Sequence, residues 1–156
     1  MDRLKFIKRA AMVAGAGILS RDFLLAAPTA KTIRVLVWDE RQPRQKQAYE
    51  NFLGNQIADH LKKQPGLSVV SAALDDADQG LSDTRLNDTD VLIWWGHARQ
   101  AEVVAEKGKE IVGRIRAGSL SLIALHSAHW ATPFVECMNE ITRIRAKLAQ
   151  SSNTNQ

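Results

Sequence analysis

The chain has 156 residues, enough for one domain with a substantial core. Of its 21 basic and 17 acidic residues, five basic and two acidic ones lie in the first 30, which leaves a nearly balanced 16 and 15. The remaining chain has no excess of basic residues, so we expect no nucleic-acid partner. The single cysteine, Cys137, excludes an internal disulfide and a multi-cysteine zinc site.

Residues 1–30 are typical of an export signal. A basic start, MDRLKFIKR, precedes a short run of small and apolar residues, and FLLAAPTA then offers small residues suited to cleavage. The run is too short and too rich in Gly and Ala for a membrane span, so we expect none in the mature chain. DRLKFIK is similar to the twin-arginine pattern, with Leu4 where the second arginine should stand. We expect a periplasmic or extracellular protein, exported by the Sec route or by an imperfect twin-arginine signal. An amphipathic N-terminal helix is the alternative.

From residue 31 onward, apolar runs alternate with segments of helical spacing. Strands are predicted where the apolar run is unbroken, and helices where apolar residues recur every three to four positions. In chain order the prediction is a strand over 32–38, a helix over 46–64, a strand over 67–74, a helical turn near 82–86, a strand over 90–95, a helix over 100–117, a strand over 119–125 and a helix over 131–148. The remaining residues, 149–156, read as a polar, disordered tail.

This alternation predicts an α/β domain over 31–148, with a parallel sheet covered on both faces. In such sheets ligands bind at the carboxyl ends of the strands. A sheet of four strands has an unpaired edge, so we also expect either a homodimer or poor solubility.

Three of the predicted strands end on polar residues beside a tryptophan: Trp38-Asp39-Glu40, Trp95-Gly96-His97 and His126-Ser127-Ala128-His129 before Trp130. Imidazole and carboxylate groups suit zinc or a similar divalent ion. The predicted metal ligands are His97, His126, His129 and Asp39. A polar pocket without metal is the alternative, because histidines at strand ends serve either role.

The tryptophans and Ser127 also have two interpretations each. The indoles of Trp38, Trp95 and Trp130 either stack on a sugar or pack in the core. Trp94 should point to the opposite face from Trp95 and lie in the core. Ser127 follows a strand and precedes a helix, so it is either a nucleophile in a strained turn or a residue that caps the last helix.

The stretches LIWWGHARQAEV and LIALHSAHW, together with VLVWDE on the first strand, resemble the ThuA-like (trehalose utilisation) family. The likeness runs from about residue 33 to residue 140. It implies a flavodoxin-like fold, related to class I glutamine amidotransferases, with strand order 2-1-3-4-5. Family members are usually longer, so we expect an incomplete sheet of about four strands. The family's W-G-H histidine corresponds to His97, and its L-H-S-x-H histidines correspond to His126 and His129. Ser127 stands where the amidotransferases have their cysteine, so glutaminase chemistry is not expected.

The resemblance implies a role in the metabolism of trehalose or a related disaccharide, with a sugar bound at the carboxyl edge of the sheet. In this hypothesis His97, His126, His129 and Glu40 are catalytic, a divalent metal such as zinc assists, and the reaction is hydrolase-like. Substrate contacts come from Trp38, Trp95, Trp130 and Ser127. The second hypothesis is a non-catalytic domain that binds a sugar or a partner, or a truncated paralogue of the family.

Overall fold

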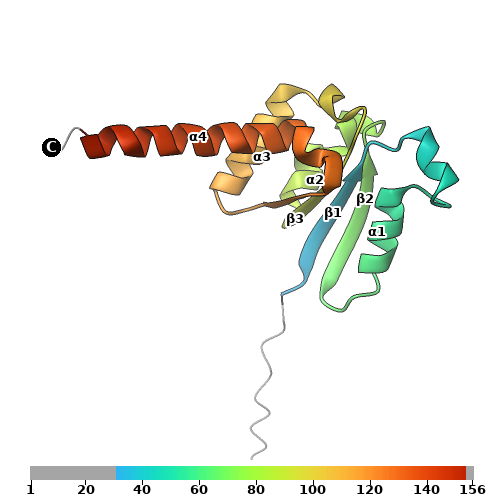
Figure 1. Cartoon of the computed structure of the whole chain (residues 1–156). Helices are drawn as coiled ribbons and strands as arrows, with labels where there is room; N and C mark the ends of the chain where they lie inside the picture. The colour runs from blue at the N-terminus through green and yellow to red at the C-terminus, as the bar shows by residue number, and fades with distance from the viewer. Residues whose placement is uncertain (1–30, 154–156) are drawn as a thin grey trace, which may run out of the picture.

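The computed structural model describes residues 31–153, so the predicted export signal lies outside the described residues. Four strands alternate with four helices and short 3-10 turns (Figure 1). The strands are β1 (Ile33–Asp39), β2 (Leu67–Ala73), β3 (Val91–Trp95) and β4 (Ser121–Ala124). The helices are α1 (Leu53–Leu61), α2 (Asp83–Asn87), α3 (Ala105–Arg116) and α4 (Thr132–Asn153). The 3-10 turns are η1 (Pro43–Gln47), η2 (Ala77–Gly80), η3 (Gln100–Glu102) and η4 (His126–Trp130).

The strands form one parallel sheet in the order β2-β1-β3-β4. This order confirms the predicted flavodoxin-like α/β fold. The chain passes to one side of β1 for β2 and to the other side for β3 and β4. In the register of the central pair, Trp38 lies beside Trp94 and Asp39 beside Trp95. The polar ends of these strands therefore reach the same edge of the sheet.

The two faces of the sheet are covered unequally. One face packs against α2, α3 and α4 in a cluster that contains Leu36, Trp38, Leu92, Trp94 and Ile111. The other face packs on α1 through a smaller cluster around a few valines and Ala58. Both faces are fully buried only along β1, whereas β3 alternates between buried and half-buried side chains. The outer strands keep exposed side chains, because α2 has only five residues and β4 is an edge.

The first predicted helix is shorter than expected. Residues 43–47 form η1, and α1 begins only at Leu53. The first amides of a helix have no hydrogen-bond partner within the helix. Here the amide of Leu53 donates to Gln45 Oε1 at 2.8 Å, and the amide of Gly54 donates to Asp39 Oδ2 at 2.7 Å. Two side chains from outside the helix therefore decide where α1 begins, and periodicity alone could not locate them.

The last helix is longer than expected. We predicted an end near residue 148 and a disordered tail, but α4 continues to Asn153. The hydroxyls of Ser151 and Ser152 find partners within this helix, since they donate to the carbonyls of Lys147 and Leu148. Within residues 31–153, no helix combines the length and apolar character needed to cross a membrane.

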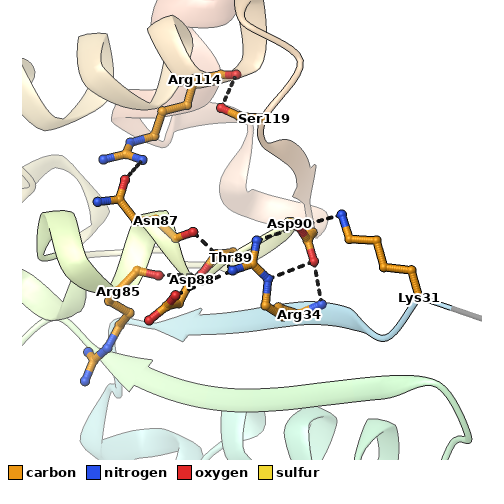
Figure 2. A network of polar contacts seen from close by, with 9 residues as sticks. All are labelled: Lys31, Arg34, Arg85, Asn87, Asp88, Thr89, Asp90, Arg114 and Ser119. Carbon is orange, nitrogen blue, oxygen red and sulfur yellow. Dashed lines mark hydrogen bonds and ion pairs between the residues drawn. The ribbon is translucent and has the colours of Figure 1, made fainter.

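At the amino edge of the sheet, a polar network ties β1 to β3 (Figure 2). The Arg34 guanidinium donates to both carboxylate oxygens of Asp90, at 3.1 and 2.8 Å, and the Arg34 amide adds a third bond at 2.9 Å. Lys31 lies 3.9 Å from the same carboxylate. Arg114 of α3 reaches Asn87 at 2.6 Å, which brings the end of α2 into the network. This edge is therefore a structural clamp, opposite the predicted site.

Candidate functional site

The predicted site lies where the loops after β1, β3 and β4 adjoin. Two hydrogen bonds join the two histidine-bearing loops directly. Ser127 Oγ donates to the Gly96 carbonyl at 2.9 Å, and Gln100 Nε2 donates to the Ser127 carbonyl at 3.0 Å. Since His97 follows Gly96 and His126 precedes Ser127, the structure brings these two histidines to one part of the edge. Both side chains are exposed.

Asp39 is fully buried and works as a structural carboxylate. Its Oδ1 accepts from the Arg41 amide at 2.7 Å and from Gln45 Nε2 at 2.9 Å, and its Oδ2 accepts from the Gly54 amide at 2.7 Å. A negative charge at the first turn of α1 also interacts favourably with the helix dipole. These contacts leave Asp39 closed to a ligand.

Glu40 is also fully buried, and it organises the loop after β3. Its Oε1 and Oε2 accept from the amides of Ala98 and Arg99, both at 2.8 Å, and Gln42 Nε2 donates to Oε1 as well. Burial alone would raise the pKa of Glu40, but these hydrogen bonds outweigh it and hold the pKa below its usual value. A carboxylate so engaged is a poor general base, and the catalytic role predicted for Glu40 finds no support in this geometry.

His126 occupies a strained backbone position. Its φ is 46°, in the left-handed region that non-glycine residues rarely adopt. The other positive φ values of non-glycine residues belong to Arg41, Phe52, Asp78 and Gln79, in the loops after β1 and β2. Within residues 31–153, all five such residues thus lie in connections that leave the carboxyl edge. Strain of this kind clusters at functional sites, so it marks this edge rather than the amino edge.

The elbow geometry falls on His126 and not on Ser127. A nucleophile elbow places its nucleophile at the strained residue between strand and helix. Here Ser127 is 8% exposed, and its hydroxyl is used in the bond to Gly96. Ser127 therefore joins the two loops. The substrate contact predicted for it finds no support in this geometry.

His129 and Trp130 form the outer part of η4. His129 Nδ1 lies 3.3 Å from the His126 carbonyl, and the imidazole is exposed. Its ring centroid lies 5.2 Å from that of Trp130, at an interplanar angle of 49°. Trp130 is 71% exposed. An indole so exposed can stack on a flat or sugar-like ligand.

The other three tryptophans differ in burial: two lie in the core and one is half-buried. Trp38 and Trp94 are fully buried and stack with ring centroids 3.8 Å apart, which confirms Trp94 as core. Trp38 Nε1 donates to the Gln79 carbonyl at 2.8 Å. The predicted substrate role of Trp38 is therefore wrong in this fold, because no part of the indole reaches the surface. Trp95 is half-buried at the end of β3, beside Asp39 in the register.

The predicted metal ligands do not come together. Within residues 31–153, no three side chains of His, Cys, Asp or Glu are arranged to hold a metal ion. Asp39 is occupied by three N–H donors, and the histidines lie on exposed turns. The donor set does not fit zinc in this arrangement, and we derive no step through a metal.

Sequence reasoning missed two features of this region. The first is Gln100, 3% exposed, whose Nε2 links the two histidine loops while its Oε1 has no partner within the described residues. The second is a hollow of about 540 Å³ between η2 and the start of α3, lined by Asp78, Gln79, Ser82, Asp83, Thr84, Val104 and Lys107. Glutamine carries no motif signal, and the hollow depends on how two loops meet. Only the polar, Gly-containing sequence of 75–89 hinted at a special connection.

No protein-family model matches the chain, and no curated protein is similar enough in sequence to be matched to it. The resemblance to ThuA-like proteins therefore stays a prediction from the W-G-H and L-H-S-x-H stretches.

Proposed function

We propose that this chain is a ThuA-like protein of carbohydrate metabolism that binds a sugar at the carboxyl edge of its sheet. His97, His126 and His129 would hydrogen-bond the hydroxyls, and Trp130 would stack on the ring. The observation that carries the proposal is the joining of two histidine-bearing turns next to an exposed indole, at the edge where backbone strain collects. Binding fits this geometry better than turnover, because both nearby carboxylates are engaged by N–H donors.

A second candidate is turnover, and the strained backbone of His126 favours it. In this case the His126 imidazole would act as the general acid or base, without a metal. Such an enzyme would show a bell-shaped dependence of rate on pH, whereas a binding domain would not.

A sugar substrate is also consistent with the export signal predicted for residues 1–30, because an exported protein meets sugars outside the cytoplasm.

The test is calorimetric titration of the full chain with trehalose and with an oxidised (keto) disaccharide. We expect Trp130→Ala and His126→Ala to raise the dissociation constant at least about tenfold, which is roughly 1.4 kcal/mol. The control is His60→Ala, since His60 is exposed in the last turn of α1, away from this edge. If neither sugar binds, or if all three variants bind alike, the proposed site is wrong. Release of monosaccharide by the native chain, lost in His126→Ala, would favour the second candidate.

A further inference from the structure

The most unusual surface of the molecule is the second half of α4. The first half is held to the body: Thr132 Oγ1 donates to the Val103 carbonyl at 3.1 Å, and Glu140 pairs with Arg116 of α3 at 3.0 Å. From Ile141 through Ser152 every side chain is exposed, and Figure 1 shows this part running clear of the sheet. A single helix of this length is only marginally stable in water, because most helical stability in proteins comes from packing.

An apolar stripe runs along the exposed second half of α4 and the turn before it. Met138, Ile141 and Ile144 are 48%, 42% and 43% exposed, and Leu148 is 63% exposed. The apolar positions alternate at spacings of four and three: Cys137, Ile141, Ile144 and Leu148. Phe134, one step earlier at the same spacing, packs against the core of the domain. This is the spacing that packs one helix against another in a coiled coil. The stripe therefore suits a helical partner.

The charges on α4 are divided between its two halves. Residues 132–140 contain Glu136 and Glu140 and no basic residue, and residues 141–153 contain Arg143, Arg145 and Lys147 and no acidic residue. Two parallel copies would place like halves side by side. Two antiparallel copies would place each basic half against an acidic half and would also oppose the two helix dipoles. The helix is thus complementary to itself in one orientation.

We propose that two copies of this chain form an antiparallel dimer through the stripe on α4. In the symmetric register Ile141 packs against the partner's Ile144, and Cys137 against the partner's Leu148. Glu140 then lies beside the partner's Arg145. This surface is separate from the sugar site, so the dimer does not depend on the proposed function. It also differs from pairing along the free edge of β4, the basis on which the sequence predicted a dimer.

An anionic membrane is the other surface that a basic amphipathic helix could meet. The distribution of charge argues against it. The stripe begins at Cys137, in the half that carries Glu136 and Glu140, and these carboxylates would be repelled by anionic headgroups.

The first experiment is sedimentation of the full chain across micromolar concentrations. We expect a dimer for the native chain, and a dissociation constant raised at least about 100-fold by the double variant Ile141→Glu with Ile144→Glu. The matched control is Thr142→Glu with Ala146→Glu, which adds the same charge on the opposite, exposed side of α4 and should remain dimeric. A native chain that is monomeric throughout overturns the proposal. Co-sedimentation of such a monomer with phosphatidylglycerol vesicles would assign the stripe to a membrane surface.

A second variant tests the orientation without disturbing the centre of the stripe. In Leu148→Cys, mild oxidation should link Cys137 of one copy to the new cysteine of the other, as mapped by mass spectrometry of peptides. Native chain, with Cys137 alone, should form no linked dimer. Links between two copies of position 137, or between two copies of position 148, would overturn the antiparallel arrangement.

Discussion

At the scale of single residues, the site depends on hydrogen bonds that backbone amides donate to buried carboxylates. Asp39 and Glu40 are neighbours in sequence at the end of β1, yet they stabilise different segments. Asp39 fixes the start of α1, and Glu40 fixes the turn after β3. The space around them is correspondingly tight. A Cβ added at Gly54 would lie 2.5 Å from Asp39 Cβ, closer than real side chains come. The absence of a side chain at Gly54 is what lets the carboxylate reach the helix.

This close approach leads to a prediction for two glycines in helices. Gly54→Ala should lower the free energy of unfolding by about 1–3 kcal/mol, because Asp39 or α1 must shift to make room. The matched control is Gly113→Ala in α3, where nothing lies within 4 Å of the added Cβ. There the gain in helix propensity should stabilise the protein by about 0.5–1 kcal/mol. Urea unfolding at pH 7 measures both, and equal effects at the two positions would contradict the tight packing described for Asp39.

At the scale of elements, the amino edge shows how a charge pair joins strands that are far apart in sequence. Hydrogen bonds from the Arg34 side chain and amide, with the charges of Arg34 and Lys31, hold the pKa of Asp90 well below its usual range. A carboxyl whose pKa falls on folding stabilises the folded state at pH values above its unfolded pKa, near 4. That contribution is lost as the pH falls through the folded pKa.

Asp90→Asn should therefore lower the urea midpoint at pH 7, and its difference from the native chain should shrink as the pH falls below about 4. Asp88→Asn is the control: Asp88 lies 3.5 Å from Arg34 but is 76% exposed, so we expect little change at either pH. Unfolding curves at three pH values between 3 and 7 test this. A pH-independent loss in Asp90→Asn would mean that the carboxylate charge is not what ties β1 to β3.

At the scale of the whole molecule, stability is concentrated at the centre of the sheet. Leu92 on β3 is fully buried, whereas Ile123 on the neighbouring edge strand is 47% exposed. We expect Leu92→Ala to cost about 2–5 kcal/mol, since it removes buried methyl groups and leaves a cavity, and Ile123→Ala to cost much less. Thermal unfolding followed by circular dichroism compares them. Similar losses at both positions would indicate that β4 is covered in solution, for example by a second copy along the edge.

Much of the fold could be predicted from local patterns. The unbroken apolar runs located all four strands to within two residues, and their alternation with helices led to the parallel sheet. The start of α1 could not be predicted, because it is set by hydrogen bonds to side chains of the preceding segment, Gln45 and Asp39, and hydrophobic periodicity does not show such bonds. The end of α4 was missed because Ser and Asn are typical of tails, although here the hydroxyls of Ser151 and Ser152 bond within a helix.

For the site, the sequence by itself determined which residue types lie at the carboxyl edge, because local patterns predict where the strands end and in which order they are connected. Only the tertiary structure decided what each residue does there. Trp38 and Trp130 look alike in sequence, but packing buries the first and leaves the second exposed. Asp39 and Glu40 resemble metal ligands or bases, but the amide of Gly54 in α1 engages the first and two amides of the loop after β3 engage the second. The physical reason is that burial and hydrogen-bond partners are set by contacts between distant segments, which no local pattern contains.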